Sequence, residues 1–367
     1  MLDKGAVRIN GVVKDYAWGN PDFIPSLVGG YSGKPQAEYW MGTHRNGEAV
    51  LEDGSKLSEY AGHELGFLLK ILAIDNPLSI QCHPNKRQAT DGWRREAKLR
   101  SEGAEVNYQD PNQKAEAFIA LTPVLAMCGF QPLSSIRDNL KATVPEGFRE
   151  IEPHFSSCWE LYSALYSLSA EKKKAVIDEL SQGIPESDDL SMLSVSGVIR
   201  RCLSLYPDDI GCLFPLILNM VKLDPGEGVF LEPGILHAYC YGNGVEVMTA
   251  SDNVLRGGLT HMRMDMAELR RIAVFEQYNA SKCKTTIDES GRKEYLFPCD
   301  DFKLVRIGAG DFRIRGEEES VGMVVDGHIM VETSSGQLEI KKGQSLYIPG
   351  GLDYTIHSEG SAYFARG

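Results

Sequence analysis

The sequence predicts a mainly β protein with a helical insertion, in which two β-barrels of the jelly-roll kind accompany an all-α subdomain. Three observations support this prediction. Short apolar runs broken by Gly, Pro and Asn fill residues 1–130. Apolar residues recur at helical spacing between about 132 and 209. A Gly–strand–Pro unit then occurs twice in the later chain, as two related barrels would require.

The 367 residues are enough for two to three domains of about 100–200 residues each. We expect four segments along the chain: the first part of one barrel in 1–130, a helical insertion in 131–211, the second part of that barrel in 212–278, and a degenerate C-terminal barrel in 279–367.

Strands are expected first at 7–10, then at 78–83 and 116–121, and turn signals at Asn76-Pro77 and Thr122-Pro123 bound the latter two. The polar stretch 87–101 is expected to be helical. It follows closely on His83, so we expect it to border a site.

Three helices are expected in the insertion. Val176, Ile177 and Leu180 lie at helical spacing, with Ser169 as the N-cap and a stop at Gly183 and Pro185. Two further helices are expected from similar triplets: Leu161, Leu165 and Leu168, and Val198, Cys202 and Leu205. A later helix is expected to begin at Asp265, with Glu268 completing a capping box.

The charge balance excludes some partners. With 38 basic and 51 acidic residues, the net charge of -13 argues against a broad nucleic-acid footprint, but a few local cations suffice for a small phosphorylated substrate. The first residues lack a secretory pattern, and no apolar run is long enough for a membrane span. Eight scattered cysteines without a CxxC pair favour reduced, mostly buried thiols and a cytoplasmic protein.

The repeated unit suggests where a metal would bind. In the first copy, Gly226 precedes the apolar strand 229–231 and Pro233, and His237 follows four residues later. The second copy has Gly343, the strand 346–348, Pro349 and Asp353 in the same order. We therefore expect a metal in the first barrel only. The alternative is that Gly–strand–Pro is general β punctuation.

Four residues are candidate metal ligands. Gln81 and His83 share one face of a strand, Glu116 starts an apolar strand, and His237 closes the first repeat. Two His, one Glu and one Gln would form a nitrogen and oxygen site suited to zinc with one position left open. The alternative is that the histidines are hydrogen-bonded core residues.

Other polar residues are candidates for substrate chemistry. Arg256 follows a polar turn and precedes Gly257-Gly258, and its fork suits a phosphate or an enediolate. Lys70, Lys86 and Lys114 are candidate phosphate ligands, with Ser79 as a hydroxyl donor. The alternatives are a structural arginine in a surface loop and solvated surface lysines.

Five motifs occur in order along the chain: YAWG at 16–19, AEYWMGTH at 37–44, LSIQCHPNK at 78–86, NQKAE at 112–116, and the run from HAY at 237–239 to ASDNVLRGGLT at 250–260. In these motifs the sequence resembles the type I phosphomannose isomerases, over nearly its whole length.

The resemblance implies a zinc-dependent cupin enzyme that interconverts mannose 6-phosphate and fructose 6-phosphate, with its catalytic site in the first barrel. It implies one Zn²⁺ per chain, with roles for ten residues: metal ligands Gln81, His83, Glu116 and His237; catalytic Arg256, with Glu246 and Asp252 nearby; Lys86 in acid–base work; and Ser79 and Lys114 near the phosphate.

The chain departs from the family pattern at two places. Gln113 and Ala115 stand where the family usually has His and Pro, and His261-Met262 follows Leu259-Thr260 where Pro-Lys is common. A lysine that could reach the phosphate is therefore missing. Arg263 is one residue further on, and strand alternation would point it the other way.

Aldose–ketose isomerisation through a cis-enediol needs a base and an electrophile at two adjacent oxygens. Glu246, Asp252, Lys86 and a metal-bound water are all candidates for the base. Two other functions stay open: a different metal-cupin enzyme such as an iron oxygenase, which often uses two His and one carboxylate, and a sugar-binding module without turnover. We expect a monomer that acts on a small sugar phosphate, without nucleic acid or membrane.

Overall fold

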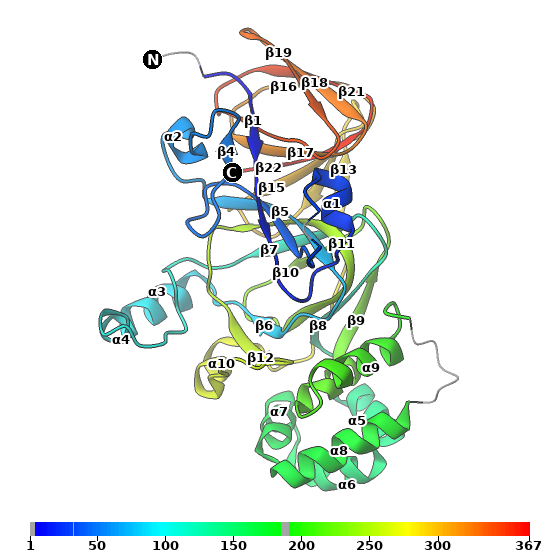
Figure 1. The fold of residues 1–367 in the computed structure, drawn as a ribbon. Helices are drawn as coiled ribbons and strands as arrows, with labels where there is room; N and C mark the ends of the chain where they lie inside the picture. The colour runs from blue at the N-terminus through cyan, green and yellow to red at the C-terminus, as the bar shows by residue number, and fades with distance from the viewer. Residues whose placement is uncertain (1–3, 32, 185–190) are drawn as a thin grey trace.

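The computed structural model describes residues 4–31, 33–184 and 191–367, and it is a mainly β protein with a helical block at one end (Figure 1). The predicted fold class is confirmed. The described strands pair in open orders rather than in a closed ring, so the two barrels predicted from the repeat are present as sheets.

The largest sheet holds ten strands and carries the residues of interest. They are β2 (Val12–Lys14), β3 (Glu38–Met41), β5 (Phe67–Ile74), β6 (Ile80–Cys82), β7 (Glu116–Ala120), β8 (Val124–Phe130), β9 (Leu218–Leu223), β10 (Gly228–Leu231), β11 (His237–Thr249) and β12 (Leu255–Gly258).

β11 connects the two halves of this sheet. Its later residues pair with β5 and β7, and its first residues pair with β6 and β8. The register with β8 shifts between Tyr239 and Tyr241, and such an irregularity lets a strand bend from one ladder into the next. One long strand therefore presents His237 at its start and Glu246 near its end to a common space.

An eight-stranded sheet and a four-stranded sheet form the upper part of Figure 1. The first contains β13 (Lys284–Ile287), β14 (Lys293–Leu296), β15 (Lys303–Ile307), β22 (Ser361–Arg366), β17 (Ser320–Asp326), β20 (Ser345–Ile348), β1 (Val7–Asn10) and β4 (Val50–Leu51). The second contains β16 (Gly310–Ile314), β21 (Tyr354–Ser358), β18 (His328–Thr333) and β19 (Gly336–Lys341).

The N-terminal strand joins this distant sheet. β1 pairs with β20, with Ile9 opposite Ser345, and β4 pairs with β1. The division into segments 1–130, 131–211, 212–278 and 279–367 stays a proposal. β1 and β4 lie in the first of these segments, but they pair into the eight-stranded sheet with the C-terminal strands.

The helical block lies between β8 and β9 in the chain (Figure 1). It contains α5 (Leu133–Thr143), α6 (Pro145–Ile151), α7 (Cys158–Ser167), α8 (Ala170–Gly183) and α9 (Val195–Leu205), with 3₁₀ helices η1 (Glu152–His154) and η2 (Ile210–Leu216). The other helices are α1 (Phe23–Val28), α2 (Leu57–Ala61), α3 (Lys86–Arg95), α4 (Ala97–Ser101) and α10 (Met266–Ile272).

Most helix predictions are confirmed. Ser169 caps α8 by accepting a hydrogen bond from the Lys172 amide, and Gly183 is the last residue of that helix. Pro185 lies outside the described residues. The predicted helices around Leu165 and Cys202 are α7 and α9, with Leu168 just after the end of α7.

The stretch 87–101 is helical as predicted and forms two helices, α3 and α4, because the chain leaves helical geometry at Glu96. One helix prediction needs correction. Asp265 does cap α10, but the Glu268 carboxylate accepts from the Tyr108 hydroxyl at 2.6 Å and from Arg95 at 2.5 Å instead of returning to the cap. The predicted capping box is therefore only half present.

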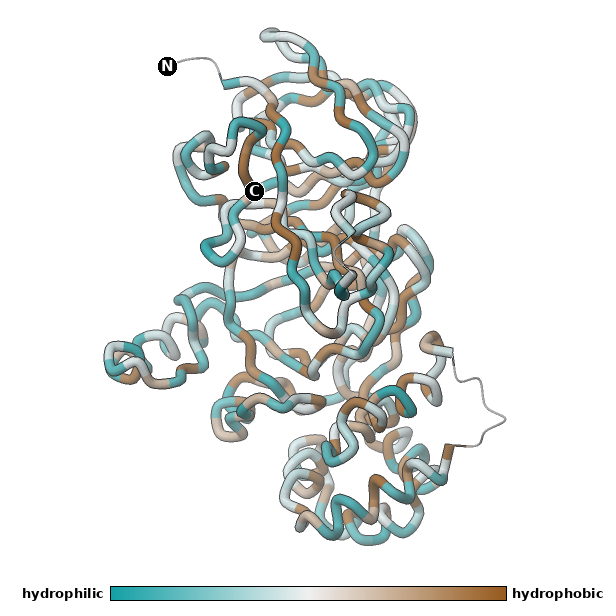
Figure 2. Tube along the Cα trace, in the orientation of Figure 1, coloured by the Kyte–Doolittle hydropathy of each residue, from teal (hydrophilic) through white to brown (hydrophobic). Residues whose placement is uncertain are grey.

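The core follows the pattern of the sequence. Figure 2 shows hydrophobic residues along the inner strands such as β5, whose eight residues are all buried, while the α3–α4 arm is largely hydrophilic. All eight cysteines are free and six are buried, as expected from their scattered positions. No described helix combines the length and apolar character needed to cross a bilayer.

Candidate metal centre and substrate cavity

Neighbouring strands of the ten-stranded sheet bring the predicted metal ligands together. Gln81 lies on β6, His83 follows it, Glu116 begins β7 and His237 begins β11. In the β ladder, Gln81 is opposite His237 on one side and opposite Arg256 of β12 on the other. Residues far apart in the chain therefore meet at one place in the fold.

Three of these side chains form a tight buried cluster. The ligand atoms of His83, Glu116 and His237 all lie within 4.8 Å of one another. The Glu116 carboxylate faces both rings, with Oε1 at 3.0 Å from His237 Nε2 and Oε2 at 3.4 Å from His83 Nε2. No other such group of His, Cys, Asp or Glu side chains occurs among the residues that the structure describes.

The histidine tautomers suit a metal. His83 Nδ1 lies 2.8 Å from the Asn253 carbonyl and His237 Nδ1 lies 2.9 Å from the Ile235 carbonyl. Because a carbonyl only accepts, each Nδ1 carries the proton and each Nε2 presents a lone pair. His237 Nε2 is buried without a hydrogen-bond partner. Lone pairs that face a carboxylate at this distance fit a shared cation.

The electrostatics agree with this donor set. Burial and then the Lys114 ammonium lower the pKa of His83 to about 4, so its ring is neutral near pH 7. Burial alone would raise the pKa of Glu116, but Lys114 and His83 hold it well below its usual range. Neutral imidazoles and an ionised carboxylate are the forms that bind zinc, so the residues present fit that ion.

A cavity of about 530 Å³ opens beside the cluster. Its lining includes most of the predicted site residues: Ser79, Gln81, Lys114, Glu116, Glu246, Asp252 and Arg256. The volume is within the range of small-molecule sites.

A buried ion-pair network forms one wall of the cavity. Lys70 of β5 lies opposite Glu246 in the ladder, and its Nζ is 3.0 Å from one Glu246 oxygen and 3.6 Å from Glu38. Burial would lower the pKa of Lys70, but the two carboxylates raise it above its usual value. Burial raises the pKa of Glu246, and Lys70 only partly opposes this. Sequence reasoning named Lys70 without selecting it; its signal was a single charge inside an apolar strand.

Asp252 is held by three neighbours at the rim of the cavity. Its oxygens lie 3.2 Å from His44 Nε2, 3.1 Å from Arg45 and 2.9 Å from Asn46 Nδ2. Burial would raise the pKa of Asp252, but the interactions with His44 and Arg45 outweigh it and lower the pKa. Sequence reasoning missed His44, although this buried residue ends one of the five motifs.

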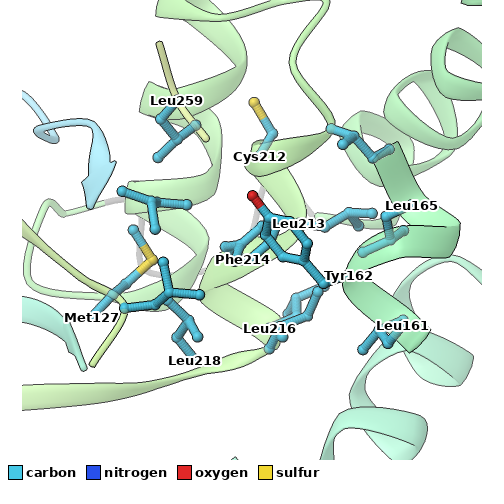
Figure 3. Packing of buried hydrophobic residues seen from close by; sticks show 14 of the residues in the cluster. Met127, Leu161, Tyr162, Leu165, Cys212, Leu213, Phe214, Leu216, Leu218 and Leu259 are labelled. Atoms are coloured by element: carbon cyan, nitrogen blue, oxygen red, sulfur yellow. The ribbon is translucent and has the colours of Figure 1, made fainter. Parts of the chain in front are cut away.

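Arg256 is an unpaired cation in the cavity wall. Among the described residues, no hydrogen bond or ion pair reaches its guanidinium, and partial burial lowers its pKa. The helical block fixes the strand that carries it, because Tyr162 and Tyr166 of α7 donate to the Gly257 carbonyl at 2.9 and 3.1 Å. Figure 3 shows Tyr162 packed with Phe214 in the core cluster that also contains Leu259.

Lys86 and Lys114 lie in different surroundings. Lys86 begins α3 as an exposed residue outside the cavity lining, and its Nζ donates to Asn112 Oδ1 at 2.7 Å. The buried Lys114 ammonium bonds to Glu116 and lies 3.2 Å from His83 Nε2.

The departures from the family pattern fall in two classes. Gln113 and Ala115, just before β7, line a separate cavity, and Gln113 donates to Asp301 at 2.6 Å. His261 and Met262 do line the substrate cavity. Arg263 pairs with Asp265 at 3.3 Å instead.

The second copy of the repeat has the same turn but a different end. Gly226 and Gly343 have φ values of +84° and +81°, which favour glycine in both turns. Asp353, at the position that corresponds to His237, accepts from the Gly316 amide at 3.2 Å. The first copy alone therefore contributes to the His–Glu–His cluster described above.

Comparisons with known proteins agree with this geometry. Residues 6–133 match the model of the phosphomannose isomerase type I catalytic domain. The mannose-6-phosphate isomerase of Salmonella typhimurium is 34% identical over 96% of this chain and 97% of its own length. The human mannose-6-phosphate isomerase is 29% identical over 92% and 91% of the two chains.

Solved structures show the same fold. An alanine variant of the Salmonella typhimurium phosphomannose isomerase superposes with a TM-score of 0.89 at 28% identity over 99% of both chains. A mannose 6-phosphate isomerase bound with zinc and yttrium superposes with a TM-score of 0.87 at 29% identity, again over 99% of both. On this sequence similarity, fold and cluster, the chain belongs to the type I phosphomannose isomerase family.

Proposed function

We propose that this protein interconverts mannose 6-phosphate and fructose 6-phosphate through a cis-enediol, with one zinc ion per chain. The observation that carries the proposal is the buried cluster of His83, Glu116 and His237 at the side of a cavity that also contains an unpaired arginine. Full-length relatives named mannose-6-phosphate isomerase support the choice of substrate.

In this proposal His83, Glu116, His237 and Gln81 hold the zinc. Gln81 lines the cavity and neighbours His237 in the ladder, so its amide oxygen is the natural fourth donor. Bound zinc would act as a Lewis acid that polarises the sugar oxygens or orients them. The ordered Nδ1–carbonyl contacts keep both rings in the ligating orientation.

We assign the proton transfer between C1 and C2 to Glu246. Its buried carboxylate lines the cavity, and burial raises its pKa toward pH 7. A general base works best when its pKa lies near the working pH. Lys70 holds the carboxylate in place at 3.0 Å. Asp252 has a lowered pKa and Lys86 lies outside the cavity lining, so both support the base role less well.

Arg256 stabilises the negative charge of the enediolate in this scheme. Its guanidinium lines the cavity and is not neutralised by any described carboxylate, so its charge is available to an oxyanion. Asp252 keeps the rim ordered through His44 and Arg45. Ser79 and Lys114 stay our proposed phosphate contacts, although Glu116 already neutralises Lys114.

We also propose that the protein works as a cytoplasmic monomer on a free sugar phosphate, without nucleic acid or membrane. Eight free cysteines suit a reducing compartment, and the net charge of -13 disfavours a nucleic-acid partner.

The test is a coupled assay on the purified protein, which follows fructose 6-phosphate formation from mannose 6-phosphate with and without a chelator. We expect turnover that the chelator abolishes and added zinc restores. Oxygen consumption with a metal-loaded sample would support an iron oxygenase instead. Binding of mannose 6-phosphate without any turnover would support a sugar-binding module.

A further inference from the structure

Some basic side chains of the substrate cavity are paired with a carboxylate, and others are not. Five basic side chains line it: His44, Lys70, Lys114, Arg256 and His261. The first three each face a carboxylate, namely Asp252, Glu246 and Glu116. Arg256 and His261 have no carboxylate partner among the residues that the structure describes. These two groups are therefore the unneutralised basic groups of the lining.

The carboxylates of the lining lie next to His44, Lys70 and Lys114, the basic side chains that they neutralise. Glu38, Glu116, Glu246 and Asp252 come from β3, β7, β11 and the loop that follows β11. A phosphate dianion would be repelled by these groups at short range and attracted by unpaired donors. If Arg256 serves the reacting carbons, then His261 is the remaining unpaired basic group for the phosphate, because Glu116 already neutralises Lys114.

The backbone around His261 is firmly anchored. Leu259 is fully buried and has a φ of +50°, a left-handed conformation that costs energy for a residue with a side chain. The Thr260 amide donates to Asp209 Oδ2 at 3.1 Å, and Asp209 also caps η2. This sharp turn brings Thr260 and His261 to the cavity lining.

The helical block also positions the imidazole itself. The Tyr206 ring, at the end of α9, packs against the His261 ring with 5.2 Å between centroids and a tilt of 37°. Tyr206 lines the same cavity and lies near enough to Arg256 for its pKa to be affected, although burial is the main cause of its raised pKa. Tyr206 thus connects the two unpaired groups.

We propose that His261 is a phosphate-binding residue, which donates an imidazole N–H to the phosphate of the sugar while Tyr206 holds the ring in place. A neutral imidazole can make this hydrogen bond, and a protonated one adds charge. The proposal rests on the proposed function for the identity of the sugar. It supplies the phosphate contact that the Met262 position, uncharged in this chain, does not provide.

The test compares His261→Ala and His261→Lys with the unchanged protein and with His328→Ala, a matched loss of histidine on β18. The readouts are KM and kcat for mannose 6-phosphate, the inhibition constant of inorganic phosphate, and kcat/KM for unphosphorylated mannose. We expect His261→Ala to raise KM and the phosphate inhibition constant about tenfold, the loss of one charge-assisted hydrogen bond. We expect kcat within about twofold, unchanged kcat/KM for mannose, and recovery in His261→Lys.

An unchanged KM and phosphate inhibition constant in His261→Ala would overturn the proposal. An equal loss with mannose and mannose 6-phosphate, or no recovery in His261→Lys, would do so as well, since both indicate a packing role. If the unchanged protein shows no isomerase turnover, the proposed function fails separately. Calorimetric titration of inorganic phosphate into the same variants then still decides the role of His261.

Discussion

The Tyr162 hydroxyl donates a 2.9 Å hydrogen bond to the carbonyl oxygen of Gly257, the residue that follows Arg256. Tyr162 belongs to the helical block and Gly257 to the ten-stranded sheet. A segment that looks like an accessory insertion therefore fixes the strand that carries Arg256, an arginine of the cavity lining.

Replacement of Tyr162 by Phe tests this connection. The aromatic ring keeps its packing, so the expected loss is about 1 kcal/mol of unfolding free energy for one buried hydrogen bond. We also expect kcat to fall several-fold, because Arg256 loses part of its positioning. Chemical denaturation and steady-state kinetics measure the two effects.

Tyr60→Phe is the control. It removes a similar 2.9 Å bond, to the Gly5 carbonyl far from the cavity, and should lower stability without changing kcat. Equal kcat values in both variants would argue against the positioning role.

Replacement of Lys70 by Met should destabilise the protein strongly. It leaves Glu38 and Glu246 buried without their shared cation, and the loss of one partner of a buried ion pair typically costs about 3–5 kcal/mol. Urea denaturation measures the loss. The double variant Lys70→Met with Glu246→Gln should recover part of it, since one uncompensated charge is then removed. A single variant as stable as the unchanged protein would contradict the buried network.

The single variant Lys70→Met should also change how the unfolding free energy depends on pH. The pKa of Glu246 in the folded protein is raised above its value of 4.5 in the unfolded chain, mainly by burial. The folded state therefore binds more protons in this window, and the stability contribution is lost as pH rises through the folded pKa. Without Lys70 the folded pKa of Glu246 rises further, so as pH rises above 4.5 the unfolding free energy should go on falling to a higher pH than in the unchanged protein. A parallel pH profile in both proteins would be inconsistent with this assignment.

Glu246→Gln and Asp252→Asn should separate the base from a residue that orders the rim. We expect Glu246→Gln to lower kcat by about 10²–10⁴ and to remove the fall of kcat on the acid side. Asp252→Asn keeps the side-chain size, so we expect a smaller loss of kcat. The fall of kcat on the acid side should be retained in this variant. Stopped assays across a pH series measure both profiles. The reverse order of effects would assign the base to Asp252.

Local features were predictable because they depend on neighbouring residues. The Ser169 cap needs only a side-chain oxygen three residues before an amide. The alternation along β6, which places Gln81 in the cavity lining and Cys82 in the core, follows from residue spacing alone. Strand alternation and the repeat made Gln81 and His237 candidate ligands, but the pairing of their strands was not predictable, because no local pattern encodes contact between distant strands.

Long-range pairing explains what was missed. Nothing near Ile9 indicates that it lies opposite Ser345 in the C-terminal sheet. The second half of the capping box failed because Glu268 finds Tyr108 and Arg95, both distant in sequence. Lys70 and His44 are polar residues that only their partners, Glu246 and Asp252, make recognisable as parts of the cavity.

The central claim is that His83, Glu116 and His237 hold a zinc ion on which isomerisation depends. The most direct measurement determines zinc content and mannose 6-phosphate turnover on the same samples of the unchanged protein, Glu116→Gln and His237→Ala. We predict about one zinc per chain in the unchanged protein, and a joint loss of zinc and turnover in both variants. Full turnover in either variant without bound zinc would contradict the account.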